Sequence, residues 1–577
     1  MRRTIGCAAA LLTLAVMPAL PAAAAPHPDG DYSEAYFPSN DGFATNLHAD
    51  ILRPKGMPLD AEHKTPVIMA VTPYGNHSGG TTETQFTATG PNSRFYDFLT
   101  LSGALKKGYT YVQVDLPGFG GSSGCNDWGG FREQAAVKAA VEWAAAQPWS
   151  TGKVALLGKS YDGWTGLMGI SQQPQGLAAV VSLEPVYAGY RYYYNNGVRF
   201  LNSVATPALF QAIDAKPGTT QDTPMYHANG APQAWCYGVN MAIGQIDDPS
   251  HEFWRERDLL ISSVGESTPL LLTQGFLENN TKPDGAFDYW NSLDLAESHA
   301  WFVQMDHCRA WETQTACGGG SNTGPLAAGR AGFIDQAMRF LDEHLKGIEP
   351  AVEDPAVAVQ DNRGMFRAES QWPPVDMSTY WSDLRSGTYT DDAGINLQGV
   401  DRVWSFSAPL EHDVWLSGEP IVKVRVNAPA PRANVVADVY DVGPGGDAVL
   451  INRGTYLLRA QGDQFATFDL YGQDWRIPAG HRIGVVVGGS DASSSGFWVH
   501  VPTEQTIDLV SARIGLPFLY WEREPEEYLD GGSTPRLQAH LGSEIAVGSQ
   551  IPGAEIPFNL PGPLVERPDE DEETQAA

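Results

Sequence analysis

A serine between closely spaced glycines is the residue of this chain best placed to act as a nucleophile. Ser160 lies in the sequence Gly158-Lys-Ser-Tyr-Asp-Gly163, directly after an apolar run at residues 154–157. Such a run is typical of a central parallel strand that is covered on both faces. A sharp turn from this strand into a helix needs small neighbours and exposes the serine hydroxyl at the edge of the sheet. The following helix would direct its amide groups at negative charge that develops on a substrate.

The segments before Ser160 favour a nucleophile over an ordinary helix cap. A Gly-x-Ser pattern alone fits either role, and Asp162 stands where the commoner G-x-S-x-G pattern has its second glycine. However, residues 131–149 have the apolar spacing of a helix, and residues 108–115 have the composition of another buried strand. Alternating strands and helices of this kind predict an α/β fold with a doubly wound parallel sheet.

A carboxylate and a histidine follow the serine along the chain, each just after an apolar segment. Glu278 comes first and His307 second, which with Ser160 is the chain order of the α/β-hydrolase triad. A glutamate can orient and stabilise an imidazolium as an aspartate does. Asp284 and Asp288 lie in the same region and remain alternatives for the acid.

Two segments resemble the Xaa-Pro dipeptidyl-peptidase family of serine hydrolases, which includes cocaine esterase and the α-amino-acid ester hydrolases. Residues 141–164, VEWAAAQPWSTGKVALLGKSYDGW, resemble the nucleophile region, and residues 420–457 resemble the carboxy-terminal jelly roll. The resemblance implies that the Tyr74 hydroxyl, in a Pro-Tyr pair after a strand, donates to the oxyanion hole. The backbone N–H of Tyr161, which follows the nucleophile, is the expected second donor. The family has aspartate in a G-x-x-D pattern where this chain has Glu278.

The expected architecture is α/β: an α/β-hydrolase domain with an inserted helical cap, followed by a C-terminal jelly-roll β-sandwich. Residues 1–25 have the basic start, apolar centre and small-residue end of a secretory signal peptide. The catalytic domain is assigned to residues 26–349, with an aromatic-rich cap at about residues 187–264. Residues 350–560 contain short alternating segments with Gly/Pro turns, which indicate the β-sandwich. Residues 561–577 form an acidic tail that is expected to be disordered.

Composition limits the compartment and the partners. The formal charge of −31 argues against nucleic acid or an anionic membrane as a partner. Four cysteines remain after the expected cleavage, an even number that permits two disulfides in an exported protein. Cys308 and Cys317 are the nearer pair in sequence, which would leave Cys125 with Cys236; other pairings stay open. No cofactor is expected, and no spacing typical of a zinc site is present, so no metal is predicted.

The resemblance implies a serine hydrolase that works through an acyl-enzyme and releases Xaa-Pro dipeptides from peptide N-termini, and the signal peptide predicts that it is secreted. Glu184 and the cap aromatics are candidates for a pocket that recognises the substrate's ammonium group. The alternative is a carboxylic ester or α-amino-acid ester hydrolase of the cocaine esterase type. A remote alternative is a surface- or carbohydrate-binding protein whose hydrolase domain is inactive. The expected partner is a small peptide or ester, and a homo-oligomer stays open.

Overall fold

The computed structural model describes residues 27–78, 90–214, 218–230, 234–391, 402–489, 498–499, 504–547, 551 and 553–567. The predicted signal peptide and most of the predicted acidic tail lie outside the described residues. Within the described part, no helix is both long and apolar enough to cross a membrane.

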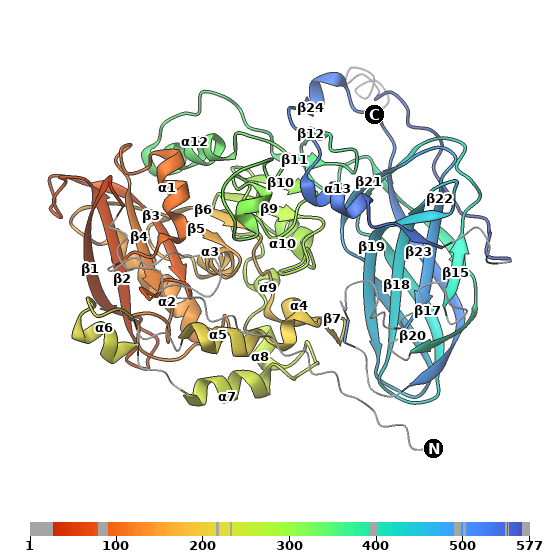
Figure 1. Ribbon diagram of the computed structural model, residues 1–577, viewed down its shortest axis with the longest axis horizontal. Helices are drawn as coiled ribbons and strands as arrows, with labels where there is room; N and C mark the ends of the chain where they lie inside the picture. The colour runs from red at the N-terminus through yellow and green to blue at the C-terminus, as the bar shows by residue number, and fades with distance from the viewer. Residues whose placement is uncertain are drawn as a thin grey trace.

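The N-terminal part is built on an eleven-stranded sheet (Figure 1). Its strands, in spatial order, are β1 (Gly30–Pro38), β2 (Asn46–Pro54), β4 (Thr110–Asp115), β3 (Thr65–Thr72), β5 (Ser150–Lys159), β6 (Leu177–Leu183), β9 (Leu270–Gly275), β10 (His299–Val303), β11 (Val357–Gln360), β12 (Phe366–Glu369) and β24 (Tyr528–Leu529). The run from β4 to β11 is parallel, and the strands beyond it at both edges are antiparallel. The predicted α/β class is therefore confirmed.

Helices cover both faces of this sheet, which is why its central strands are apolar throughout. Helices α2 (Phe131–Ala145) and α3 (Tyr161–Gln172) contribute to the hydrophobic core on one face. Helices α1 (Tyr96–Ser102) and α12 (Phe333–Lys346) contribute to the core on the other. Helix α12 ends at Gly347, which is in the left-handed conformation that favours glycine.

Short helices form the segment expected as a cap, between β6 and β9. They are α4 (Gly189–Tyr193), α5 (Thr206–Asp214), α6 (Pro224–Asn229), α7 (Ala234–Ile243), α8 (Glu252–Arg255) and α9 (Leu259–Ser262), with the two-stranded ribbon of β7 (Tyr194–Asn195) and β8 (Val198–Arg199). Helices α5 to α8 lie along the lower edge of the molecule in Figure 1. Phe210 of α5 packs its ring 5.0 Å from that of Trp128 and 5.0 Å from that of Tyr161. The cap thus rests on the start of α3, next to Ser160.

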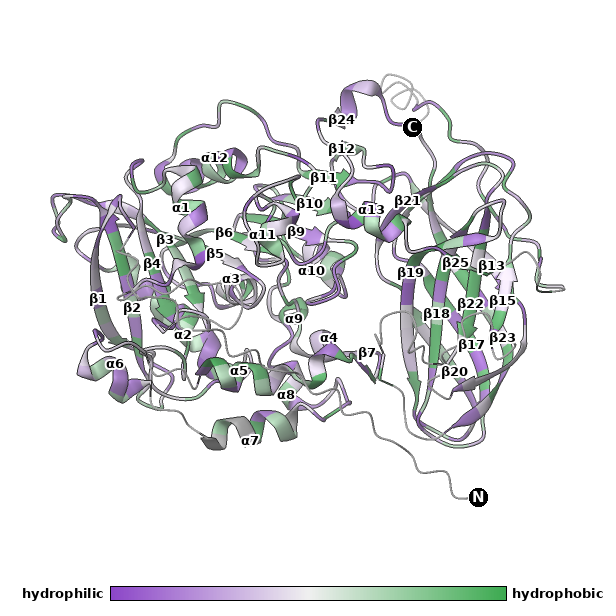
Figure 2. Cartoon of the chain, viewed as in Figure 1, coloured by the Kyte–Doolittle hydropathy of each residue, from purple (hydrophilic) through white to green (hydrophobic). Residues whose placement is uncertain are grey.

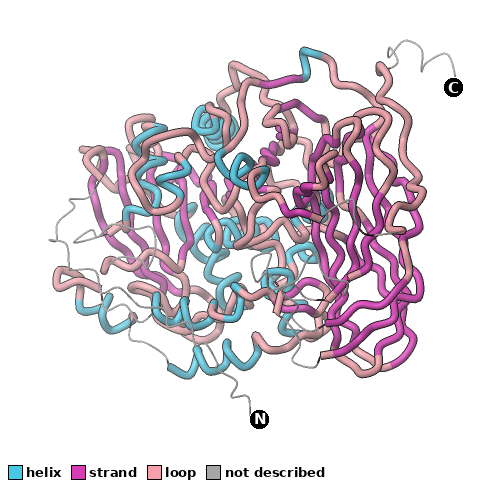
Figure 3. The backbone as a smooth tube through the Cα atoms, turned by 45° about the vertical axis from the view of Figure 1, so that its right-hand side comes forward, coloured by secondary structure: helices cyan, strands magenta, loops and turns pink. Residues whose placement is uncertain are grey.

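The C-terminal part is a β-sandwich, as expected from its short alternating segments. One sheet contains β13 (Met377–Leu384), β14 (Gly387–Asp391), β16 (Val414–Gly418), β17 (Ile421–Ala428), β20 (Gly462–Asp469), β21 (Gln473–Ile477) and β23 (Gln505–Leu519). The other contains β15 (Val403–Phe406), β18 (Ala433–Val442), β19 (Asp447–Leu458), β22 (Arg482–Gly488) and β25 (Ile545–Ala546). Hydrophobic residues run along strands such as β22 in Figure 2, and strands and loops dominate this side of the molecule in Figure 3.

The hydrolase sheet extends beyond β10, the strand that leads to His307. Strands β11 and β12 follow residue 350 yet pair with β10 and with each other, and β24 joins from beyond β23. The expected boundary at residue 350 therefore precedes strands that belong to the hydrolase sheet. β11 and β12 have four residues each, too few for their pattern to distinguish them from sandwich strands.

Candidate active site

Ser160 occupies a strained turn between β5 and α3. Its φ of 68° and ψ of −122° lie outside the regions that non-glycine residues ordinarily adopt. Its N–H donates to the Leu183 carbonyl at 2.8 Å, which ties the turn to the end of β6. A Cβ on Gly158 would lie 2.0 Å from the carbonyl oxygen of Asp162, so only glycine fits beside this turn. The half-buried serine thus stands at the carboxyl edge of the sheet, as the sequence predicted.

The two residues predicted to donate to the oxyanion both contact one aromatic residue of the cap. The Phe210 ring is 5.9 Å from that of Tyr74 and 5.0 Å from that of Tyr161. Tyr74 is half-buried just past β3, and the guanidinium of Arg94 stacks on its ring at 4.1 Å. The Tyr161 hydroxyl donates to buried Glu133 at 2.6 Å, which leaves the backbone N–H as its only candidate donor to substrate. The oxyanion roles of Tyr74 and Tyr161 stay predictions.

The structure brings Glu278 to His307. Glu278 Oε1 lies 3.5 Å from His307 Nδ1; the carboxylate is fully buried, and the imidazole is 15% exposed. The same carboxylate accepts hydrogen bonds from the Asn280 N–H, the Thr281 hydroxyl and the Lys282 N–H. Burial by itself would raise the pKa of Glu278, but the charge of His307, together with these donors, lowers it to about 2. The carboxylate is therefore ionised and fixed beside the imidazole.

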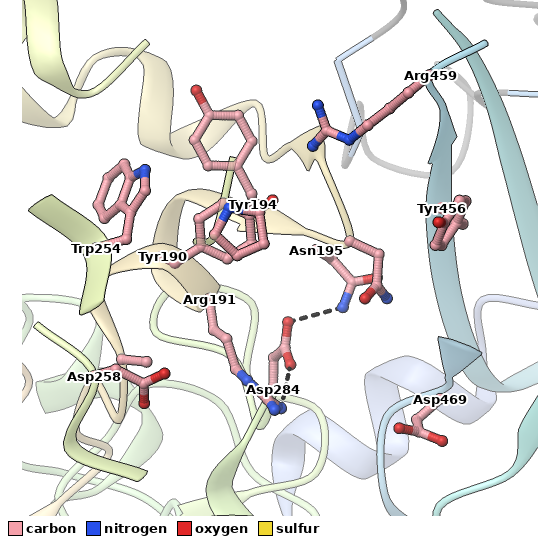
Figure 4. A pocket seen from close by; sticks show the side chains of 13 residues that line it. Tyr190, Arg191, Tyr194, Asn195, Trp254, Asp258, Asp284, Tyr456, Arg459 and Asp469 are labelled. Atoms are coloured by element: carbon pink, nitrogen blue, oxygen red, sulfur yellow. Dashed lines mark hydrogen bonds and ion pairs between the residues drawn. The ribbon is translucent and has the colours of Figure 1, made fainter. Parts of the chain in front are cut away.

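The two alternative acids lie elsewhere. Asp284 accepts hydrogen bonds from Arg191 at 3.2 Å and Asn195 at 2.8 Å, and Asp288 pairs with Arg191 at 3.0 Å. Figure 4 shows Asp284 with these partners in a polar pocket of about 330 Å³ between the cap and the β-sandwich. The residues that line this pocket do not include Ser160, Glu278 or His307. The ionic partner of these aspartates is thus an arginine rather than the histidine.

Glu184 does not face a substrate pocket, so this expectation was wrong. Its carboxylate is fully buried and accepts hydrogen bonds from the Gly275 N–H at 2.8 Å and the Thr273 hydroxyl at 3.2 Å. Burial and the nearby charge of Glu278 raise its pKa well above the usual value. Glu184 follows β6 directly and has a φ of 45°, which turns its side chain against β9. Its position after a strand resembled that of a site residue, and sequence alone did not indicate this turn.

Buried charged side chains next to the turn at Ser160 were not identified from the sequence. The Arg94 guanidinium pairs with Asp162 and donates to the Lys159 carbonyl at 3.0 Å. Arg309, two residues after His307, donates to the Arg94 carbonyl at 3.0 Å. These contacts join the turn at Ser160 to the loop that carries His307. They also give Asp162 a buried ionic partner, which explains why an aspartate stands where the commoner motif has its second glycine. No pattern in the sequence linked these three distant segments.

The acid loop is also fastened to the cap by a buried lysine. The Lys282 ammonium donates to the Tyr192 carbonyl at 2.9 Å and to Asn202 at 3.3 Å, while its backbone N–H holds Glu278. Burial lowers the pKa of Lys282 to about 7.

The β-sandwich contacts the loops that carry the acid and the histidine. Arg536 of α13 (Pro535–Leu541) donates to the Leu277 carbonyl at 3.3 Å and lies 3.5 Å from the Asp306 carboxylate. Arg453 of β19 donates to Asn279 at 2.9 Å. The C-terminal domain therefore braces the residues on either side of Glu278 and the residue before His307.

Both disulfides suggested by the sequence form. Cys308 pairs with Cys317, and Cys125 pairs with Cys236. The first bridge closes the loop that begins at His307, and the second joins the glycine-rich loop after β4 to cap helix α7.

Known proteins match this chain over both of its domains. Residues 41–309 match the X-Pro dipeptidyl-peptidase (S15 family), and residues 350–511 match the X-Pro dipeptidyl-peptidase C-terminal non-catalytic domain. A Streptomyces avermitilis relative named for Xaa-Pro dipeptidyl-peptidase activity is 23% identical over 82% of this chain and 81% of its own length. A Mycobacterium bovis relative named as a serine esterase is 24% identical over 67% of this chain and 79% of its own.

Solved structures share the fold. A CocE/NonD family hydrolase from Staphylococcus aureus superposes with a TM-score of 0.64 at 17% identity, covering 85% of this chain and 94% of its own. An α-amino acid ester hydrolase gives a TM-score of 0.59 at 15% identity, covering 88% and 99%. The two family matches occur in sequence order, span about three quarters of the chain and contain Ser160, Glu278 and His307. The chain belongs to the X-Pro dipeptidyl-peptidase (S15) family of serine hydrolases.

Proposed function

We propose that this serine hydrolase releases Xaa-Pro dipeptides from the N-termini of peptides. The observation that carries the proposal is the contact between buried Glu278 and His307, in a chain whose Ser160 occupies a strained elbow. A buried carboxylate on the Nδ1 side of an imidazole leaves the Nε2 side to accept a proton from the nucleophile. Relatives named for this peptidase activity match most of the chain.

In the proposed reaction, His307 removes the proton from Ser160 as Oγ attacks the carbonyl carbon of the proline residue. Glu278 holds the imidazole tautomer and stabilises the imidazolium that forms. The Tyr161 N–H and the Tyr74 hydroxyl stabilise the oxyanion. His307 then protonates the leaving amine, and water attacks the acyl-enzyme with His307 as the base, which restores Ser160.

Ester hydrolysis is the second candidate, and the position of Glu184 favours it. A dipeptidyl-peptidase must recognise a free ammonium group, and the carboxylate expected to do so is buried against β9 instead. A simple carboxylic ester has no such group to be recognised, and its alkoxide leaves with less assistance from a general acid than an amine does.

The experiment compares Ala-Pro-p-nitroanilide with p-nitrophenyl butyrate, for the purified protein and its Ser160→Ala variant. Anilide cleavage that the variant lacks supports the peptidase. Ester cleavage alone, also lost in the variant, moves the assignment to the esterase. If the variant matches the parent on both substrates, Ser160 is not the nucleophile.

We further propose that the protein is exported. All four cysteines beyond residue 25 form disulfides, and such bonds persist in oxidising compartments. N-terminal sequencing of protein from the culture medium tests this proposal, with a start near residue 26 as the expected result. A start at Met1 in protein recovered only from cells would contradict it.

A further inference from the structure

A buried group of histidine and carboxylate side chains lies apart from the triad. His48 and Asp50 are two positions apart on β2, so their side chains point to the same face of the sheet. His77, in the loop after β3, joins them there. One ligand atom from each of the three lies within 4.8 Å of the others, and all three residues are buried.

Each histidine also lies beside a carboxylate through its Nδ1 atom. His48 Nδ1 lies 2.9 Å from Asp115 Oδ2, and His77 Nδ1 lies 2.6 Å from Asp222 Oδ1. A carboxylate in this position fixes the imidazole with its proton on Nδ1 and its lone pair on Nε2. Metal-binding histidines are characteristically held in this way.

The Nε2 atom of each histidine lies near carboxylate oxygens as well. His48 Nε2 is buried without a hydrogen bond, 3.4 Å from Glu34 Oε2 and 3.6 Å from Asp50 Oδ1. His77 Nε2 lies 2.9 Å from Asp50 Oδ2. Lone pairs on nitrogen and oxygen repel at these distances unless a positive charge lies between them. Ligands of tetrahedral zinc, bound at about 2.0–2.1 Å, lie roughly 3.3 Å apart, close to the separations seen here.

The negative charge of the cluster also favours a bound cation. Glu34, Asp50, Asp115 and Asp222 bring four carboxylates, and the ion pairs found for them among the described residues all go to His48 or His77. Tyr32 adds a neutral donor to Asp50 at 2.9 Å. Four carboxylates against two imidazoles leave the cluster negative whether or not the imidazoles are protonated, and a divalent ion would reduce that charge.

We propose that His48, Asp50 and His77, with Glu34 as the fourth ligand, bind one zinc ion. Two nitrogen and two oxygen ligands suit zinc, and a complete set of four protein ligands is the mark of a structural rather than a catalytic site. The proposal departs from the absence of a metal expected from the sequence, because the ligands come from three segments without a recognisable spacing.

The ion would connect the cap to the loop that carries Tyr74. His77 is three residues after Tyr74, and its Nδ1 partner Asp222 lies just before cap helix α6. The backbone N–H of His77 also donates to the Tyr226 hydroxyl of α6 at 3.1 Å. Zinc would thus hold β1, β2, the Tyr74 loop and α6 in one arrangement, without taking part in acyl transfer.

The test measures bound zinc directly. The purified full-length protein is stripped with EDTA, equilibrated with zinc chloride and passed through a desalting column, and its zinc content is measured by mass spectrometry. We expect about one zinc per chain, a fall in Tm when EDTA removes it, and a tetrahedral visible spectrum after cobalt(II) replacement. His77→Gln and Asp50→Asn should lose the metal. His63→Gln should keep it, because His63 forms an exposed pair with Asp60 at 2.9 Å outside the cluster.

The wild-type result decides the question even where a variant fails to fold. Wild-type protein that retains no zinc after equilibration and has the same Tm with and without EDTA would overturn the proposal. The two imidazoles would then carry second protons in place of the ion. Zinc that remains at the wild-type ratio in folded His77→Gln would also overturn it, since the ion would be bound elsewhere.

Discussion

Replacing Glu278 with glutamine should remove most of the activity without unfolding the protein. The change keeps the size of the side chain and removes its charge. At the 3.5 Å between Glu278 Oε1 and His307 Nδ1, and with an effective dielectric constant of about 20, two unit charges attract by about 5 kcal/mol. This attraction is gained in the transition state, where the imidazole becomes charged. It corresponds to roughly three to four orders of magnitude in kcat, since about 1.4 kcal/mol is tenfold.

The hydrogen bonds around Glu278 strengthen this expectation. The carboxylate accepts from the Asn280 N–H, the Thr281 hydroxyl and the Lys282 N–H as well as facing His307. A glutamine must place its NH₂ against one of these donors or against His307 Nδ1, where it would favour the wrong tautomer.

The assay is kcat/KM for whichever of the two chromogenic substrates the parent enzyme hydrolyses, with circular dichroism and Tm as controls for folding. Asp284→Asn is the matched control, because Asp284 binds Arg191 and Asn195 and should affect kcat much less. Folded Glu278→Gln with kcat within tenfold of the parent would refute the assignment of the acid. A large loss in Asp284→Asn alone would transfer the role to that residue.

Four further predictions follow from the contacts around the triad. Arg536→Ala should lower kcat about tenfold with little change in Tm, because it removes the contacts of this arginine with the loops that carry Glu278 and His307. An unchanged kcat would show that these contacts do not position the two residues. Replacing Cys308 and Cys317 with serine should lower the unfolding free energy by about 2–3 kcal/mol and also lower kcat, measured by urea unfolding and steady-state kinetics. Gly158→Ala should abolish activity or folding, since its Cβ would meet the Asp162 carbonyl oxygen; an active, stable variant would disprove the steric requirement. The pKa of Glu278 is lowered to about 2, which corresponds to a contribution of about 3 kcal/mol to the free energy of unfolding. This contribution is present above the ordinary pKa near 4.5 and is lost as the pH falls toward 2. In urea titrations at different pH values, Glu278→Gln should lack this part of the acid dependence.

The sequence predicted the parts of the fold that depend on local pattern. The apolar run before Ser160 and the glycines beside it specify a buried strand and a tight turn, and the structure contains β5 and the elbow there. Glu278 and His307 were predicted as site residues because each follows a core strand, and the structure places the two side chains beside each other. The alternating segments beyond residue 400 likewise indicated the strands of the β-sandwich.

Contacts between distant segments were not predictable in the same way. The Asp162–Arg94 pair and the brace from Arg536 each join residues that share no periodic pattern, so only the folded chain brings them together. Glu184 had the right position after a strand, but its side chain turned toward β9. The histidine and carboxylate cluster around His48 was missed because its members come from different strands and loops.

Chemical labelling can identify directly the residue that acts as the nucleophile. The protein is treated with a fluorophosphonate, digested and analysed by tandem mass spectrometry, beside Ser160→Ala and Glu278→Gln. We expect one modified residue, Ser160, no labelling in the alanine variant and much slower labelling in the glutamine variant. Modification of another residue, or equal labelling of Ser160→Ala, would contradict the account.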